Sequence, residues 1–255
     1  MFHDIHIHRE YVNADGGSPF KGGSPSAFKE QFKQSNMPVS EQYKAPFYPG
    51  NSYHITFRSI DGLILFHDLE NHDFFLQRFT YFLQPVLSCL AYCLLKNHAH
   101  FIVHINDRKN ILDSLGFIVE EKKTMAMKKF INDPENEGLI DELVERQINN
   151  FMISYVNALN KALSRKGSLF QSPFRRVQIE GDAHLQQAII YTNANAQKHG
   201  IVRDFKEHRY TSYHDVVADV SSVVDIAAIG RFFRGKEHFI KEHEIHVQRY
   251  YKGED

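Results

Sequence analysis

The residues of this chain best suited to chemistry are two histidines that stand one residue apart, His98 and His100. Side chains along a β-strand point alternately to opposite faces, so residues i and i+2 share a face at a spacing of about 6.5 Å. Two imidazoles at that spacing can converge on one metal ion, while the small Ala99 faces the other way. The apolar residues 101–103 that follow would anchor the strand in a core. The alternative is a pair of half-buried imidazoles held by hydrogen bonds.

Other histidines in the chain are weaker candidates. His6 and His8 have the same spacing, but Gly/Ser-rich sequence follows them where an anchoring strand would be needed, so we interpret them as a chance match in a flexible tail. His104 would share a strand face with His98 and His100, too far along to join the same metal shell. It is either a supporting or a structural residue, and His54 on a neighbouring strand is equally ambiguous.

The composition is that of an ordinary globular protein of 255 residues, with 42% hydrophobic residues, 24% charged residues and a net charge of -1. No apolar run reaches the roughly 20 residues that a membrane span requires. The two cysteines, Cys89 and Cys93, stand in an apolar run and are predicted to be small buried residues. Together with the absence of a signal-peptide pattern at the start, these features favour a cytoplasmic location.

Periodicity and turn signals outline the elements that must position the histidines. The order of a strand, a helix, a hairpin and further helices predicts an α+β sandwich with an antiparallel sheet. Asp182 is a plausible N-cap and Gly200 a plausible stop for one of these helices. The expected strands are 53–57, 86–95, 98–105 and 177–179, and the expected helices are 69–83, parts of 107–166 including 141–165, 183–199, and one or two within 220–255.

The helix expected at 183–199 carries Tyr191 and Asn195, which lie four residues apart and therefore on one side of the helix. Tyr191 could act as a nucleophile, with the amide oxygen of Asn195 beside it. The alternative for Tyr191 is a boundary residue whose ring covers the core and whose hydroxyl stays in water.

Residues 161–179 form a basic segment without an acidic residue. Interleaved aromatic rings would suit contacts to phosphates combined with stacking on bases. The alternative is a solvated basic helix end and turn. The predicted DNA-binding residues are Lys161, Arg165, Lys166, Phe170, Arg175 and Arg176.

Several segments, in order, resemble the motifs of the HUH single-strand DNA transposases. The similarity is strongest to the REP-associated tyrosine transposases and related single-tyrosine insertion-sequence transposases. The chain departs from them in having Leu95-Lys96 where Met-Pro is common, and in a longer, more acidic segment at 107–150. The matching segments are 97–103 (the Asn-His-U-His core, U hydrophobic), 53–58 (the first strand), 167–171 with Phe174 and Arg175, 191–196 with 200–202 (the tyrosine helix), and 210–213.

This resemblance implies a ferredoxin-like sandwich whose central antiparallel sheet carries the two histidines. The catalytic domain would span residues 49–215, with a helical insertion at about 107–150. A flexible N-terminal extension would occupy residues 1–48, and a C-terminal helical tail would occupy residues 216–255.

The resemblance also implies roles for individual residues. His98, His100 and Asn195 would bind a divalent metal ion, Mg²⁺ or Mn²⁺, and Tyr191 would attack a scissile phosphate. The products would be a 5′-phosphotyrosine and a free 3′-OH, and reversal would rejoin strands. The substrate would be single-stranded or hairpin DNA, and the protein would act as a monomer or a homodimer. The group that activates the tyrosine is not identifiable from the sequence.

Two other functions remain open at this point. The near-neutral charge and the extensions are also consistent with a non-catalytic protein that binds DNA hairpins. A metal-dependent phosphoesterase without a covalent intermediate is a third option. It would need His100 but not Tyr191.

Overall fold

The structure is a computed structural model that describes residues 44–252. Most of the predicted N-terminal extension, with His6 and His8, lies outside the described residues. Residues 44–48, which the sequence assigned to that extension, belong to the packed part of the chain. Phe47 is fully buried, and the hydroxyl of Tyr53 donates a hydrogen bond to the carbonyl of Pro46 (2.7 Å). Packing therefore begins before residue 49, the expected start of the domain.

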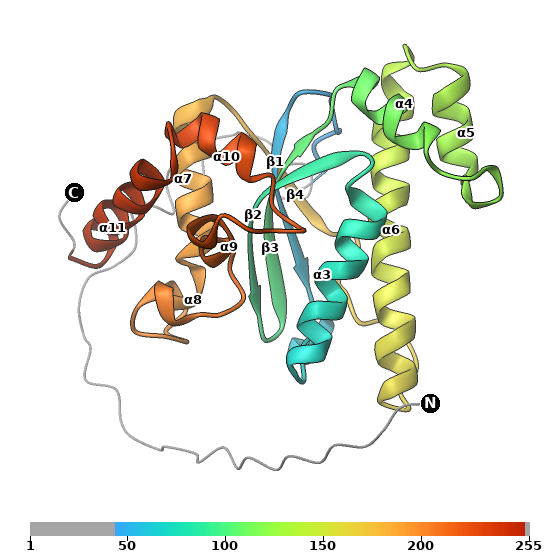
Figure 1. Cartoon of the computed structure of the whole chain (residues 1–255). Helices are drawn as coiled ribbons and strands as arrows, with labels where there is room; N and C mark the ends of the chain where they lie inside the picture. Colours follow the sequence, from blue (N-terminus) through green and yellow to red (C-terminus); the bar gives the residue numbers. More distant parts are fainter. Residues whose placement is uncertain (1–43, 253–255) are drawn as a thin grey trace. The chain divides into compact units, whose positions relative to one another are not determined.

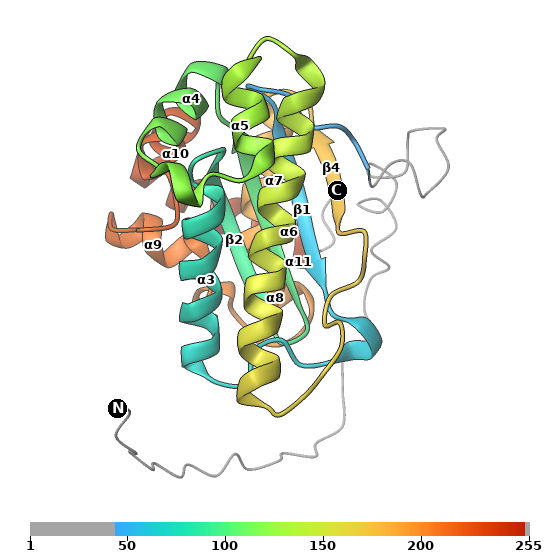
Figure 2. The ribbon, with the colours of Figure 1, turned by 90° about the vertical axis from the view of Figure 1, so that its right-hand side faces the viewer.

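The centre of the fold is an antiparallel sheet with the strand order β2-β3-β1-β4. Two helices, α3 and α6, cover one face of this sheet and pack on each other (Figure 1 and Figure 2). The chain order β-α-β-β-α-β with this strand order is the ferredoxin-like arrangement, so the predicted α+β sandwich is confirmed. The elements are β1 (Ser52–Arg58), α3 (Leu69–Leu83), β2 (Leu87–Leu95), β3 (His98–Ile105), α6 (Glu137–Ala162) and β4 (Arg175–Ile179).

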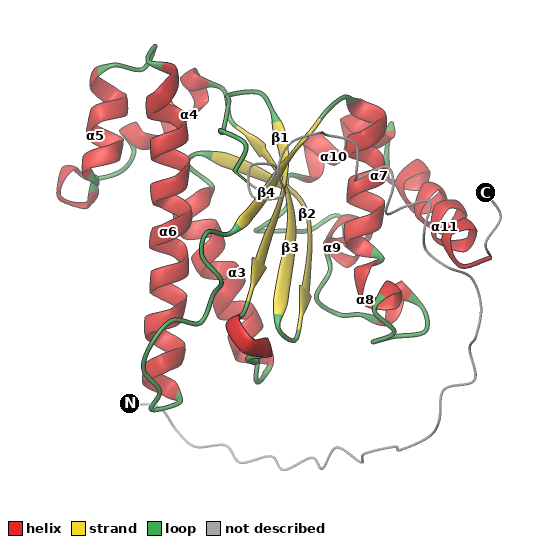
Figure 3. Ribbon diagram, turned by 180° about the vertical axis from the view of Figure 1, so that it is seen from behind, coloured by secondary structure: helices red, strands yellow, loops and turns green. Residues whose placement is uncertain are grey.

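A second helical layer lies on the opposite face of the sheet (Figure 3). Within this layer α7 contacts both β2 and β3. Its helices are α7 (Asp182–Asn193), α8 (Asn195–Lys198), α9 (Ser212–Ala218), α10 (Ile226–Phe233) and α11 (Lys236–Lys252). The helices α4 (Arg108–Gly116) and α5 (Met125–Asn132) precede α6, and short 3-10 turns occupy Ile60–Gly62, Glu120–Lys122 and Phe205–Glu207.

Alternation along β1 explains why α3 and α6 cover the face they do. Tyr53, Ile55 and Phe57 are fully buried on that face. The ring of Phe57 lies 6.4 Å from the ring of Phe75 in α3 and 5.5 Å from that of Phe151 in α6, both edge to face. This aromatic cluster fixes which face of β1 and β3 is left for polar residues.

Most predicted elements agree with the structure, but two differ. α6 begins at Glu137, four residues before the expected start, because the side chain of Asn136 caps it by accepting a bond from the Gly138 amide (3.2 Å). The helix expected at 183–199 is interrupted at Ala194, where α7 ends and α8 begins. In addition, Gly181 and not Asp182 occupies the cap position of α7.

The cysteine prediction is confirmed, because both thiols are free and buried. Among the residues that the structure describes, no helix has the length and apolar character needed to cross a membrane.

Candidate metal centre

The two histidines of β3 lie on the sheet face opposite the aromatic cluster. In the antiparallel register His98 pairs with Arg58 of β1, and His100 pairs with Thr56. His54 of β1 is on the same face, and all three histidines are half-buried. The strand geometry predicted from the sequence is therefore present.

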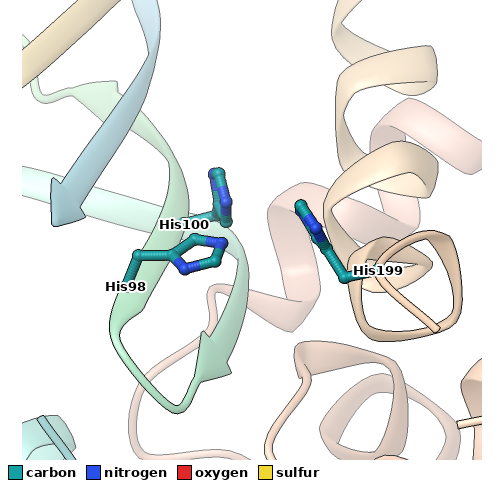
Figure 4. A group of neighbouring side chains, drawn as sticks. All are labelled: His98, His100 and His199. Carbon is teal, nitrogen blue, oxygen red and sulfur yellow. The ribbon is translucent and has the colours of Figure 1, made fainter. Parts of the chain in front are cut away.

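A third histidine, His199, completes a cluster with His98 and His100. One ring nitrogen from each lies within 4.8 Å of the other two, a spacing that could hold a metal ion. His98 and His100 project from β3 toward His199, which follows α8 in the chain (Figure 4). Sequence reasoning missed His199 because it is one of 16 histidines and stands outside any His-x-His pair.

Hydrogen bonds engage the same ring nitrogen, Nδ1, in both strand histidines. Nδ1 of His98 contacts Oδ1 of Asn97 at 2.7 Å. Nδ1 of His100 contacts Nε2 of His54 at 2.9 Å and Oγ1 of Thr56 at 3.3 Å. Nε2 of His100 is buried and has no hydrogen-bond partner among the described residues. Both rings can thus direct an Nε2 lone pair into the cluster.

The three imidazoles of the cluster are neutral at pH 7. Burial lowers the pKa of His98 to about 4 and holds the pKa of His100 well below its usual range. Burial also lowers the pKa of His199. Neutral imidazoles have free lone pairs, so no proton must leave before a metal ion binds. The buried, unpartnered Nε2 of His100 and this neutral donor set fit a divalent ion.

The charged neighbours of the cluster are basic. Arg58 acts on His98 and His199, and Lys198 acts on His100 and His199, in each case lowering the histidine pKa. His54, whose pKa burial lowers to about 4, is affected by Lys198 and His184. Among the described residues, no carboxylate is one of the groups that shift the pKa of these four histidines. This electrostatic environment favours an anionic ligand such as a phosphate group.

Tyr191 is half-buried in α7, and its hydroxyl accepts a hydrogen bond from the ammonium of Lys198. The same ammonium lies 4.1 Å from the centroid of the Tyr191 ring. Burial raises the pKa of Tyr191. Lys198 thus bonds to the tyrosine hydroxyl and also acts electrostatically on His54, His100 and His199.

Asn195, the predicted third ligand, begins α8 and is fully buried. Neither polar atom of its side chain has a hydrogen-bond partner among the described residues. A buried amide without partners is costly, so its environment is also suited to a ligand that arrives from outside the chain. Its predicted role in metal binding stays a prediction.

The predicted DNA-binding residues divide into two groups. Lys161, Lys166 and Arg175 are exposed, and Arg165 is half-buried, donating to Oδ1 of Asn160 (2.7 Å) and to the Ser168 carbonyl (2.8 Å). For these four residues, DNA binding stays a prediction.

The structure corrects the expectation for Phe170 and Arg176, each of which is only 5% exposed. Phe170 joins the aromatic cluster, with its ring 6.3 Å from that of Phe57. The guanidinium of Arg176 pairs with Glu145 (2.6 Å) and stacks on Phe47. Sequence reasoning treated the whole basic segment as surface because it could not separate the two faces of this short stretch.

Comparisons with known proteins give one distant similarity. Neither family models nor curated protein sequences match the chain. Among solved structures, a REP-associated tyrosine transposase bound to a REP hairpin is similar, with a TM-score of 0.44 and 13% sequence identity. The similarity covers 71% of this chain and 86% of that chain.

Proposed function

We propose that this protein is a metal-dependent endonuclease and strand transferase that acts on single-stranded, hairpin-bearing DNA. One observation carries the proposal: three neutral histidines converge, and the ammonium that bonds to the Tyr191 hydroxyl, that of Lys198, also acts electrostatically on two of them, His100 and His199. The motifs that resemble the HUH transposases agree with this chemistry. The activity would be that of a tyrosine transposase.

The reaction would begin with attack of the Tyr191 hydroxyl oxygen on the scissile phosphorus. A new oxygen–phosphorus bond forms, the bond to the 3′-oxygen breaks, and the phenol proton is balanced by protonation of that oxygen. The DNA 5′ end stays attached as a phosphotyrosine. Reversal of the same step by another 3′-OH would join strands without an external energy source.

Lys198 would assist this step. A phenol with a raised pKa is a poor nucleophile at pH 7, and burial raises the pKa of Tyr191. An ammonium bonded to the hydroxyl stabilises negative charge on that oxygen as the proton leaves. Lys198 therefore fits the activating group that the sequence left unidentified.

His98, His100 and His199 would hold the metal ion, with Asn195 as the fourth candidate. A bound divalent ion would neutralise charge on the scissile phosphate and polarise its phosphorus. Three nitrogen donors favour Mn²⁺ over Mg²⁺, because Mg²⁺ prefers an octahedral shell of oxygens. The sequence left both Mg²⁺ and Mn²⁺ open, and the additional nitrogen donor of His199 is a reason to prefer Mn²⁺.

A DNA path to the site would follow the basic segment. The Ile60 amide donates to the Leu169 carbonyl (3.0 Å), and the Ser59 amide donates to the Asn97 carbonyl (2.9 Å). These bonds join the segment that follows α6 to the end of β1, next to the β2–β3 turn that leads into His98. Arg175 pairs with Thr56 across the sheet and so shares the histidine face. Lys161, Lys166 and Arg175 would contact backbone phosphates.

The test is incubation of the full chain with single-stranded hairpin DNA and Mn²⁺, followed by denaturing electrophoresis. We expect a covalent protein–DNA adduct and a product with a free 3′-OH. Tyr191→Phe should abolish the adduct. Tyr81→Phe is a matched control, because Tyr81 is a tyrosine on α3 that is 57% exposed.

Three other results would point elsewhere. Hairpin binding that needs no metal and no histidine, without cleavage, would identify a non-catalytic DNA-binding protein. Cleavage that persists in Tyr191→Phe but disappears in His100→Ala would identify a phosphoesterase without a covalent intermediate. An adduct that persists in Tyr191→Phe would identify a different nucleophile.

A further inference from the structure

His100 stands out in the histidine cluster because one of its nitrogens has two polar neighbours and the other has none. Nδ1 lies 2.9 Å from Nε2 of His54 and 3.3 Å from Oγ1 of Thr56. Nε2 is buried without a partner in the part of the chain that the structure describes. A neutral imidazole carries one proton, and these surroundings determine which nitrogen holds it.

A proton on Nε2 of His100 would be a buried N–H donor without an acceptor. Leaving a buried donor unpaired costs free energy, since the group has lost its hydrogen bonds to water. A proton on Nδ1 finds an acceptor at 2.9 Å in the lone pair of His54 Nε2. The second arrangement leaves Nε2 as a bare lone pair, which is the form that a metal ion requires.

We propose that His54 is a positioning residue that fixes the tautomer of His100, so that Nε2 of His100 presents its lone pair to the metal site. This inference deepens the proposed function and rests on it only for the identity of the ligand. His54 then carries its own proton on Nδ1. The arrangement parallels that of His98, whose Nδ1 contacts the amide oxygen of Asn97 at 2.7 Å.

Of the two neighbours of His100 Nδ1, His54 is the better candidate for this role. The contact to His54 is 2.9 Å and that to Thr56 is 3.3 Å, so His54 makes the closer hydrogen bond. A threonine hydroxyl and a neutral imidazole can each donate or accept, so the shorter distance together with the unpartnered Nε2 of His100 assigns His54 as the acceptor. The centroids of the two imidazole rings lie 5.2 Å apart, with the ring planes tilted by 32°.

The decisive measurement is two-bond ¹⁵N–¹H correlation NMR of the histidine rings in the metal-free full chain, with His100 assigned by the His100→Gln variant. We expect the proton of His100 on Nδ1 in the wild-type protein. In His54→Leu we expect a mixture of tautomers and a Mn²⁺ affinity lower by about 10–100-fold. His54→Gln, whose amide oxygen can accept the same bond, should restore both.

His104→Gln is the matched control, because His104 lies on the same strand and contacts Oγ of Ser52 at 3.1 Å, a histidine-to-β1 contact away from the cluster. It should change neither quantity, and Thr56→Val should change them less than His54→Leu does. A wild-type His100 with its proton on Nε2 would overturn the proposal, and so would a folded His54→Leu that keeps the wild-type tautomer and Mn²⁺ affinity.

This outcome is separable from that of the proposed function. The tautomer is read in the metal-free wild-type protein, so it decides the role of His54 even if the chain cleaves no DNA. Conversely, a protein that forms the phosphotyrosine adduct but protonates Nε2 of His100 would keep the proposed function and reject the role of His54.

Discussion

The two faces of β1 and β3 belong to the same strands but serve opposite purposes. On one face, Phe57 and its aromatic neighbours are fully buried under α3 and α6. On the other, His98, His100 and His54 are half-buried and meet basic neighbours. Adjacent residues in one strand thus differ completely in environment, because the strand turns them to opposite sides.

This difference shows that packing on one face offsets the free-energy cost of burying polar groups on the other. A face lined with imidazoles leaves buried polar atoms without partners among the described residues, as Nε2 of His100 and the Asn195 amide illustrate. The aromatic face compensates by burying large rings, which stabilise the fold by about 1.5–3 kcal/mol each. The strands are therefore held rigid by the packing of one face, and the histidines are positioned on the other.

The largest expected effect on stability comes from a substitution on the aromatic face. Phe57→Ala should lower the free energy of unfolding by about 3–5 kcal/mol, because it removes a fully buried ring and leaves a cavity. Arg58, the next residue, is exposed on the other face. Arg58→Ala should therefore change the free energy of unfolding by about 0.5 kcal/mol or less. Urea denaturation of both variants measures the contrast. Equal losses would mean that the two faces share the stabilising role.

A substitution on the histidine face should change binding instead of stability. His199→Ala should lower the Mn²⁺ affinity by at least about tenfold, since it removes one of three nitrogen donors, and should leave the urea midpoint nearly unchanged. Isothermal titration with Mn²⁺ measures the affinity. His67→Ala, which removes an exposed histidine before α3, is the control.

The same titration on Asn195→Leu tests whether the third ligand beside His98 and His100 is His199 or Asn195. If Asn195 is a ligand, the affinity falls. The metal-free protein should still be no less stable, because an unpaired buried amide is exchanged for an apolar group of similar size. An affinity that falls in Asn195→Leu and stays constant in His199→Ala would reject the three-histidine site in favour of the ligands that the sequence predicted.

An element of the fold could be predicted from the sequence where the pattern that specifies it lies within one short segment. The β3 hairpin and α3 follow from alternation and helical spacing within one segment, and their predicted bounds agree with the structure. The break at Ala194 does not, since no glycine or proline marks it. It follows Asn193, whose side chain accepts a bond from Ser212 (2.6 Å) and donates one to His243 (2.9 Å), residues far along the chain.

The residues of the candidate site also fall into those that local spacing predicts and those that only the tertiary structure brings together. His98 and His100 are neighbours in sequence, so their spacing on a strand was sufficient to select them. His199 reaches the site only because the chain around α8, which contacts β2, brings it back to the histidines of β3, and His54 only because β1 pairs with β3. Phe170 and Arg176 were misplaced for the reverse reason: their residue types suit DNA, but tertiary packing buries them.

The last contrast between the faces is the pH dependence of stability. The aromatic cluster titrates nothing between pH 4 and 7, whereas burial lowers the pKa of His54 and of His98 to about 4 in the folded chain. In the unfolded chain a histidine has a pKa of about 6.5, so the unfolded state binds more protons between these values. Stability is therefore complete above pH 6.5 and falls as the pH drops toward 4, by up to about 1.4 kcal/mol per pH unit for each such histidine.

Urea denaturation of the metal-free protein at pH 7, 6 and 5 measures this slope. His98→Gln should reduce it by the contribution of one proton, while Phe57→Ala should lower stability equally at every pH and leave the slope unchanged. A wild-type stability that is constant from pH 7 to pH 5 would mean that these imidazoles take up protons in the folded state without penalty. The histidine face would then be open to water, and the neutral, metal-ready cluster would lose its physical basis.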